Sequence, residues 1–549
     1  MSAHVEPGGL DPDHGLEPVL VGPSDRGPAP SGRSIRRYTA AAANQRGGAS
    51  LGQLLNDVYY AVISLAISIG MALGITGSLR EALPEPPSGG VDAGISLPAL
   101  VAVVVVALTG VLLSLAGRLG PVGAGGAEAA WWLSLPVDRR GLLRPASRRL
   151  PVLGAAAGAV IVALLDAGLL GGEDMAQVLR AGLGAALGAA VVVLAAGIGQ
   201  TLQVSRRTTA LVGDLVLAAA PVLALAGAVA GWSLDALPTA PAWLLGLLAV
   251  AAGLLAWLLD RRLDRIPSRS LRESGSVASQ AVGAMVSLDS RELGRALTDG
   301  AARTRRNGSR RFRGVSGAPA ALLTADATVL LRSTRHVVQI VVAALVPALV
   351  AFVPQLAGPV GFLLAILVGG YAAMTATGEG ARRAEMAPVL DRLLPLPAGH
   401  VRRWRMIVPA VVMLLWSVVA FGAVGIWAGD VASWLALGVA SAPVWAGAAI
   451  RSAYRPAPNW AGPLVSTPMG ALPSGVTSVL ARGPDVVILG MIPVAIAILL
   501  GSVLPILLGV QMVLSVIVVA VSGGTRTMME RMQDTLGQDQ AQPGGAVRR

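Results

Sequence analysis

The chain has 549 residues, of which 54% are hydrophobic and only 13% are charged, against about 25% charged in a typical soluble protein. Its net charge of +12 comes entirely from arginine, because the sequence contains no lysine, and cysteine is also absent. Disulfides and thiolate metal sites are therefore excluded, and we expect no metal or other cofactor. The arginines lie between long apolar runs, a pattern that indicates a membrane protein and no nucleic-acid partner.

The two ends of the chain are predicted to be tails. Residues 1–45 are rich in proline, glycine and charge, and they lack the charged start and short apolar core of a signal peptide. We therefore expect a disordered cytoplasmic tail there. Residues 526–549 have a similar composition and are expected to form a second cytoplasmic tail.

Between the tails, the apolar runs predict transmembrane helices. A helix of roughly 20 residues crosses about 30 Å of hydrocarbon. The last run, 486–521, is too long for one crossing, and Gly501 with Pro505 offers a break within it. The other predicted spans are 58–79, 97–117, 151–170, 181–204, 211–231, 242–259, 337–355, 358–377, 406–427 and 432–450. The fold class is therefore an all-α polytopic membrane protein with about 12 transmembrane helices.

Arginine alternates along the chain in a way that predicts the topology. Connections after even-numbered spans are rich in arginine, and those after odd-numbered spans nearly lack it. Because arginine favours the cytoplasmic side, we expect a cell-membrane protein with both termini in the cytoplasm. A basic cytoplasmic linker, 261–318, separates two six-helix halves, 46–260 and 319–525. Each half has an even number of spans, so the halves should form a parallel repeat.

An amphipathic segment precedes the first span of each half. Leu51 and Leu55 share a helical face before span one, and Leu322 and Leu330 do so before span seven, although Asp326 falls on the same side. Both segments are expected to lie in the membrane surface and lead into a span. The alternative is that each one only extends its transmembrane helix.

A short motif occurs in both halves, between the second and third spans. The two copies read WWLSLPVDRR, residues 131–140, and LLPLPAGHVRR, residues 393–403. Such a connection is suited to docking, with apolar side chains entering a partner's groove and arginines reaching acidic groups or lipid phosphates. The alternative is that the arginines only anchor the neighbouring spans.

The pattern LSLPVDRRGLL, which begins at Leu133, resembles a cytoplasmic segment of ABC-2-type exporter permeases, and the second copy is a looser match. In that family each half has six spans, an amphipathic elbow helix and a coupling helix that docks on a separate ATPase subunit. The resemblance covers roughly residues 50–525, and it implies the membrane-spanning subunit of an ATP-driven exporter bound to two ATPase copies. It implies coupling roles for Trp131, Leu133, Leu135, Pro136, Asp138, Arg139 and Arg140, and for Leu394, Leu396, Pro397, His400, Arg402 and Arg403. The composition also resembles an actinobacterial membrane-protein family of unassigned function.

The chain itself is not expected to hydrolyse ATP. A Walker A loop requires a lysine that reaches the phosphates, and the sequence has none. We therefore expect no enzyme activity in this chain, and ATP hydrolysis only in the partner. The second motif has Ala398-Gly399 where the family pattern has a small polar residue and arginine, so the first copy is expected to dock more tightly. Two alternatives remain, an ion-gradient-driven secondary transporter and a non-transporting membrane scaffold or sensor.

Acidic residues are scarce within the predicted spans. Asp166 and Asp214 lie near span ends, where we expect both to be wetted at the membrane surface, although an acid within a span is a functional candidate by default. The scarcity of charge favours a hydrophobic or amphipathic substrate taken from the bilayer. Membrane lipid is thus the second expected partner.

Overall fold

The structure is a computed structural model of the chain. It describes residues 30–47, 51–82, 94–135, 137–171, 174–286, 293–294, 296–297, 315–454, 464–467, 470–473 and 483–524. Among these residues, 11 helices are long and apolar enough to cross a membrane. The chain is therefore a multi-pass, all-α membrane protein. The orientation of its termini stays a prediction, and most of the predicted tails and much of the predicted linker lie outside the described residues.

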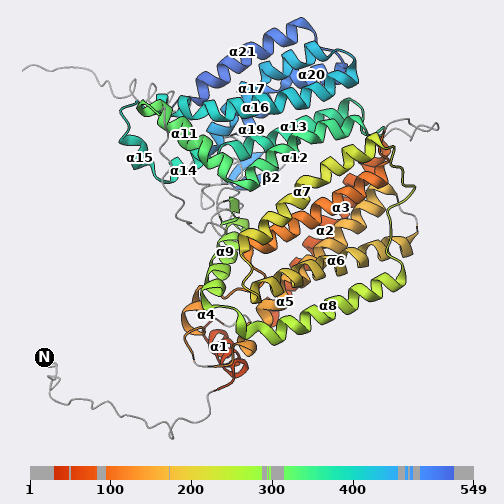
Figure 1. Ribbon diagram of the computed structural model, residues 1–549, viewed down its shortest axis with the longest axis vertical. Coiled ribbons are helices and arrows are strands. Elements are labelled where there is room, and N and C mark those ends of the chain that lie inside the picture. The colour runs from red at the N-terminus through yellow and green to blue at the C-terminus, as the bar shows by residue number, and fades with distance from the viewer. Residues whose placement is uncertain are drawn as a thin grey trace, which may run out of the picture.

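The first part of the chain forms a bundle of long helices followed by an amphipathic helix, α9 (Figure 1). The elements are α1 (Gly32–Gly47), α2 (Leu51–Ala82), α3 (Leu97–Leu119), α4 (Gly126–Trp131), α5 (Arg139–Leu164), the π-helical turn η2 (Leu165–Leu170), α6 (Met175–Thr201), α7 (Arg206–Val229), α8 (Ala242–Arg262), the 3-10 turn η3 (Leu263–Arg265) and α9 (Ser268–Val286). The predicted spans of this half are all present, and α5 begins well before its predicted span.

The second part also consists mainly of long helices, and it contains a small hairpin. Its elements are α11 (Gly317–Arg332), α12 (Thr334–Ala351), α13 (Pro359–Thr377), α14 (Glu379–Met386), α15 (Pro388–Arg392), α16 (Ala398–Ala428), α17 (Val431–Ala453), β1 (Leu464–Thr467), β2 (Gly470–Pro473), α19 (Pro484–Gly490), α20 (Ile492–Leu500) and α21 (Pro505–Ser522). The two strands pair antiparallel.

The last apolar run breaks where the sequence predicts. Helix α20 ends at Gly501, whose φ of +68° is the left-handed conformation that glycine adopts without a steric penalty. Helix α21 then begins at Pro505, whose fixed φ and missing N–H suit the first turn of a helix. A second break separates α19 from α20 just before Pro493. These two short helices occupy the predicted eleventh span, so they account for the difference between 11 long helices and twelve predicted crossings.

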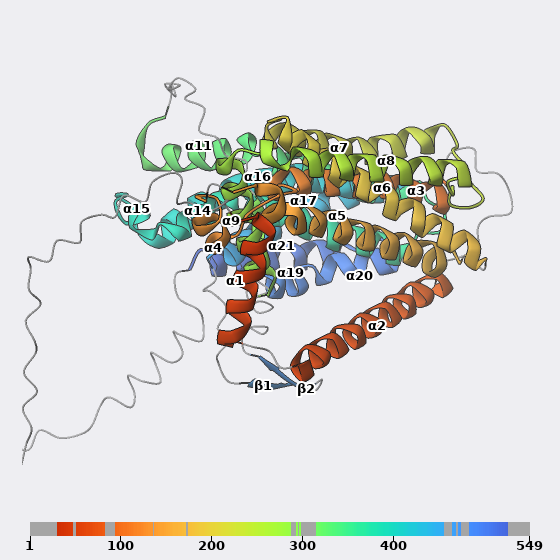
Figure 2. The ribbon, with the colours of Figure 1, turned by 90° about the horizontal axis from the view of Figure 1, so that it is seen from below.

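The helices pair in the same order in both parts. Helix α5 packs on α6, α6 on α8, and α3 on both α6 and α7; correspondingly, α16 packs on α17, α17 on α21, and α13 on both α17 and α20. The first spans differ, because α12 packs against α13 and α16 while α2 contacts mainly η2. Figure 2 shows α2 inclined away from the other spans. The shared pairings are those that a duplicated half would produce, and the repeat itself stays a prediction.

The largest core lies in the second part. Its biggest buried side chains are Phe362, Trp416, Phe421, Trp434 and Trp445, each at most 1% exposed. In the first part, close packing depends on small residues instead. A Cβ on Gly213 would lie 2.3 Å from the Ser114 backbone nitrogen, so α3 and α7 approach closely only because the glycine has no side chain.

Two expectations about the starts of the halves need correction. Most of residues 32–47 fall inside the predicted tail, yet they form α1, which packs on α5; the alanine-rich stretch Thr39–Ala43 favours helix. Residues 51–58 form no separate surface helix, because α2 is continuous from Leu51. In the second half, α11 is separate from α12, and its buried face carries Leu322, Asp326 and Leu330. A distinct helix before the span therefore exists only in the second half at the expected place.

Candidate coupling site

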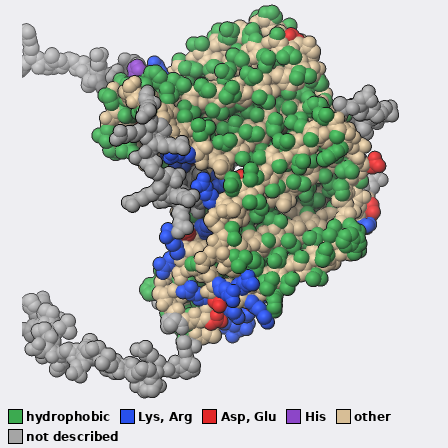
Figure 3. All heavy atoms as spheres, in the orientation of Figure 1, with side chains coloured by type: hydrophobic (Ala, Val, Ile, Leu, Met, Phe, Trp, Pro, Cys, Tyr) green, Lys and Arg blue, Asp and Glu red, His purple; other side chains and the backbone are tan. Residues whose placement is uncertain are grey.

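The arginine-bearing ends of the helices gather at one end of the bundle, called here the arginine-rich end. It comprises the C-terminal ends of α3, α8 and α17 and the N-terminal ends of α5, α7 and α16, with Arg118, Arg144, Arg206, Arg261, Arg405 and Arg451. Figure 3 shows the basic side chains along this edge, while hydrophobic side chains cover the face of the spans. Both copies of the Leu-x-Leu-Pro motif belong to this end.

The first motif follows α4 and is held by contacts to the helices around it. The Gln200 side chain forms two hydrogen bonds with the backbone of Val122. It accepts from the Val122 N–H at 3.1 Å and donates to the Val122 carbonyl at 2.8 Å. The Ala124 N–H donates to the Leu271 carbonyl in α9 at 3.1 Å. Leu133 is buried in a cluster that includes Leu271. The connection is therefore held in place by the protein itself, and Gln200 of α6 contributes two of the hydrogen bonds.

Only part of the first predicted coupling set faces outward. Trp131 is 74% exposed and Leu135 is also exposed, whereas Leu133 faces the core. Pro136 lies outside the described residues. Trp131 and Leu135 are thus the apolar side chains that a partner could contact here.

The polar residues of the first motif serve largely within the chain. Asp138 caps α5 by accepting from the Arg140 N–H at 3.1 Å. The Arg140 guanidinium donates to the Arg261 carbonyl at 2.6 Å and lies 3.7 Å from Asp264. Arg139 is half-buried. Arg140 therefore ties the start of α5 to the end of α8.

The second connection carries a larger exposed apolar surface, but upstream of the predicted residues. Its members recur at helical spacing, and each is more than half exposed: Met386 51%, Val389 63%, Leu390 65% and Leu393 77%. We call this set the α15 stripe. Leu394 and Leu396 are half-buried, Pro397 precedes the first turn of α16, and His400 is exposed. The exposed apolar side chains of this connection are therefore those of the stripe, while Leu394 and Leu396 are only partly exposed, and the coupling role of all of them stays a prediction.

A buried arginine fixes α15 to a transmembrane helix. Arg405 of α16 lies 2.7 Å from Asp391 in α15 and 2.6 Å from Asp326 in α11. Burial, with a smaller contribution from the neighbouring Asp391, raises the pKa of Asp326 to about 6 against the attraction of Arg405. Three elements therefore meet at one guanidinium, and sequence analysis had assigned Arg405 no role.

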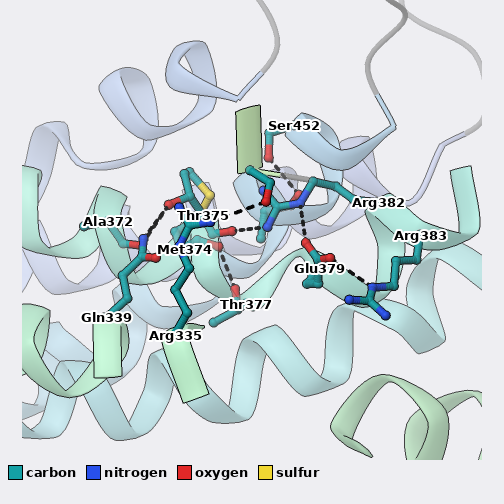
Figure 4. A network of polar contacts seen from close by, with 12 residues as sticks. Arg335, Gln339, Ala372, Met374, Thr375, Thr377, Glu379, Arg382, Arg383 and Ser452 are labelled. Carbon is teal, nitrogen blue, oxygen red and sulfur yellow. Dashed lines mark hydrogen bonds and ion pairs between the residues drawn. The ribbon is translucent and has the colours of Figure 1, made fainter. Parts of the chain in front are cut away.

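A polar network stands at the base of the same connection (Figure 4). Glu379 lies 3.3 Å from Arg382 and 3.0 Å from Arg383, and Arg382 donates to the Thr375 carbonyl at 2.5 Å. Gln339 of α12 donates to the Ala372 carbonyl at 2.8 Å. Burial would raise the pKa of Glu379, but the adjacent arginines hold it below its ordinary value. Arg382 thus fastens α14 to the end of α13, and Gln339 joins α12 to α13.

A second buried pair lies where the two parts meet. Helix α7 packs on α12 at this contact, which we call the seam. Next to it, Arg118 of α3 lies 2.7 Å from Asp214 of α7, and Ser114 donates to the same carboxylate at 2.6 Å. Asp214 is buried, which corrects the expectation of a wetted residue. The linker crosses here too: Leu297 accepts from Arg118 at 3.1 Å and Gly294 from Arg335 at 3.4 Å.

Asp166 is the other acid whose position differs from the expectation. It lies in η2, is only 1% exposed, and one of its carboxylate oxygens accepts no hydrogen bond from the described residues. A π-helical turn is frequent at functional sites. Among the described residues, no three His, Asp or Glu side chains come together as a metal site would require. Asp166 therefore stands as an isolated buried carboxyl within the membrane-spanning region.

Comparison with known proteins identifies the family but not the activity. No curated protein and no solved structure gives a match. A family model described as a family of unknown function, DUF6297, matches residues 91–463. That range covers both motifs, the seam and the Arg405 cluster. The chain belongs to this family, DUF6297.

Proposed function

We propose that the chain is the membrane-spanning subunit of an ATP-driven exporter, in which ATP hydrolysis occurs in two copies of a separate ABC ATPase. The observation that carries the proposal is the exposed α15 stripe, joined to a span by a buried ion pair. An exposed apolar patch with charged neighbours is typical of a protein interaction site. The first connection offers Trp131 and Leu135 as the corresponding contact.

The Arg405 cluster would convert docking into movement of a span. Asp391 lies in α15, and its partner Arg405 lies in α16, so a displacement of α15 acts directly on a helix of the bundle. Buried, hydrogen-bonded ion pairs have strict geometry. A partner that shifts α15 would therefore shift the start of α16 with it.

The arrangement of the two parts also supports a transport role. The matching helix pairings suit two similar bodies, and they meet at a seam between α7 and α12. Rigid-body rotation about such an interface is a common form of conformational change. ATP-driven closure of the partner would rock the two bodies about the seam.

The proposed substrate is hydrophobic or amphipathic. The buried ion pairs of the described spans, Arg118 with Asp214 and Arg405 with Asp326, are committed to partners at the arginine-rich end. Hydrophobic side chains cover the face of the spans that is seen in Figure 3. A lipid-like molecule or apolar peptide taken from the bilayer suits such surfaces better than a charged solute.

Co-purification with the ATPase encoded nearest to this chain tests the proposal. We expect a stable complex that is lost when Leu390 and Leu393 are both changed to Asp. The matched control changes Val282 and Met285 to Asp, because these α9 side chains are equally exposed but lie outside both connections. Absence of a complex with the unaltered chain, or equal loss in the control, would count against the proposal.

A secondary transporter is the second candidate, and Asp166 favours it. A buried carboxyl with an unpartnered oxygen in a membrane-spanning segment is a suitable proton carrier. Reconstitution in liposomes with the ATPase separates the candidates. Transport that follows a proton gradient, ignores ATP and is lost in Asp166→Asn would favour the secondary transporter. Complex formation without transport would favour a scaffold or sensor.

A further inference from the structure

A groove lies between α16, α17 and α21, next to the arginine-rich end. Its volume is about 410 Å³, within the range of sites that hold small molecules. The lining residues are Arg403, Pro443, Ser515, Val516, Val519 and Ala520. The groove therefore combines one cation from α16 with a wall from two further membrane-spanning helices, α17 and α21.

The cation and the deeper apolar wall are separated along the helix axes. Arg403 lies in the second turn of α16, level with the last turn of α21, which holds Val519 and Ala520. Ser515 lies about one helical turn deeper, roughly 6 Å at the helical rise. Its hydroxyl already donates to the Ala440 carbonyl at 2.5 Å. The deeper wall thus presents no free polar group from Ser515, while its entrance presents a guanidinium.

Arg403 differs from its neighbour Arg402, because the described residues give it no hydrogen-bond or ion-pair partner. Arg402 donates to the Gly524 carbonyl at 2.7 Å and stacks on the Tyr454 ring at 4.5 Å. Among the described residues, no carboxylate lies within ion-pair distance of Arg403. Its stem rests on Gly523, where a Cβ would lie 2.9 Å from the arginine Cγ. The absence of a side chain at Gly523 thus lets Arg403 lie over the end of α21.

We propose that this groove binds an anionic phospholipid, with the headgroup phosphate on Arg403 and an acyl chain along Val516, Val519 and Pro443. Charge complementarity favours this occupant, because a guanidinium at the membrane surface binds phosphate with charge-assisted hydrogen bonds. The apolar wall below it has the dimensions and chemistry for a hydrocarbon chain. This role replaces the coupling role that resemblance implied for Arg403. It does not depend on the proposed exporter activity.

Lipid binding to the purified chain in detergent tests the headgroup contact. Native mass spectrometry and thermal unfolding are measured with phosphatidylglycerol, phosphatidylcholine or inorganic phosphate added. We expect phosphatidylglycerol to bind at least tenfold more tightly than phosphatidylcholine and to raise the Tm. Arg403→Gln should lose this preference. Arg392→Gln, which removes an exposed arginine from α15, should keep it.

A second variant tests the acyl chain while leaving Arg403 in place. Val516→Trp fills the groove from a residue that is exposed at its edge, so the fold is spared and lipid binding should fall at least tenfold. The proposal is overturned if both variants bind phosphatidylglycerol as the unaltered chain does, or if phosphatidylcholine binds equally well. It is also overturned if inorganic phosphate alone reproduces the full Tm shift.

Discussion

At the first arginine-rich connection, the motif's Leu133 belongs to a core and Arg144 forms an exposed pair with Asp260. At the second, the apolar side chains face outward and Arg405 is buried between two carboxylates. Arg144 and Arg405 lie at matching positions just after the two copies of the motif, yet they differ in burial and in partners. The reason lies in the helix that packs on each span. Helix α11 brings Asp326 to α16, whereas α1, which packs on α5, contains no acidic residue.

The difference shows that two copies of a similar sequence motif need not be held in place by the same interactions. The first connection is held by burial of apolar side chains and by backbone contacts, so it is fixed before any partner binds. The second is held by charge and leaves its apolar stripe free. We therefore expect the second connection to contribute more apolar contact area to a partner, although the sequence favours the first.

The largest expected effect is the loss of Arg405. Arg405→Ala removes the counter-charge from Asp326 and Asp391 together, and breaking a buried pair in this way costs about 3–5 kcal/mol. Arg144→Ala should leave the free energy of unfolding almost unchanged, because the ion pair between Arg144 and Asp260 is exposed. Equilibrium unfolding in mixed micelles compares the two variants. Equal destabilisation by the two changes would show that the arginines have the same role.

Truncation of the matching leucines, Leu133 and Leu394, should have the opposite ranking, with the larger loss of stability at the first connection. Leu133→Ala opens a cavity in the first core and should cost about 3 kcal/mol, because the side chain is only 6% exposed. Leu394→Ala removes a half-buried side chain and should cost less than about 1 kcal/mol. The same unfolding measurement tests the pair. A larger cost at Leu394 would contradict the proposal that the first connection depends more on apolar burial.

A substitution next to the seam tests whether the stability of the first part also depends on a buried charge. Asp214→Asn keeps an acceptor for Ser114 but leaves Arg118 without a counter-charge, and should cost about 1–3 kcal/mol. Asp138→Asn is the control, because that carboxylate is exposed and an Asn caps a helix equally well. No loss of stability in Asp214→Asn would mean that water or other groups solvate Arg118.

The last expected effect is a pH dependence confined to the second connection. Because the folded pKa of Asp326 is about 6 and its ordinary value is 3.8, the folded chain binds more protons than the unfolded chain between these values. Its contribution to stability is therefore present at low pH and is lost as the pH rises through 6, on the order of 1 kcal/mol per pH unit. Asp326→Asn should remove that slope. A slope unchanged in the variant would assign it to other groups.

Local sequence patterns predicted the membrane class, most span positions and the break at Gly501 and Pro505, because these depend on composition and on backbone preferences of single residues. The pairing of Arg118 with Asp214 could not be predicted in the same way. The two residues are far apart in sequence, and only the packing of α3 on α7 brings them together. The sequence shows only an arginine at the end of one span and an acid near the start of another. Such a pattern is compatible with an ion pair but does not identify the partners.

The position of the exposed apolar surface also could not be predicted from local sequence patterns. The string Leu-Pro-Leu-Pro drew attention to Leu394 and Leu396, but the stripe is set by the short helix α15 and by the side that Arg405 holds inward. A five-residue helix has too few turns for a clear periodicity. Its orientation depends on the buried ion pair, and that pair is a tertiary contact.

Pro409 divides α16 into two arms of different length. A proline lacks the N–H that would bond to the carbonyl four residues earlier, here the carbonyl of Arg405, so the backbone is least constrained directly beyond the ion-pair cluster. The longer arm, from Pro409 to Ala428, is about 20 residues and about 30 Å in length, which matches the hydrocarbon thickness. The pivot would then sit at the membrane surface. The short N-terminal arm of α16 could then change direction outside the membrane, while the long arm stays in the membrane with a length that matches the hydrocarbon.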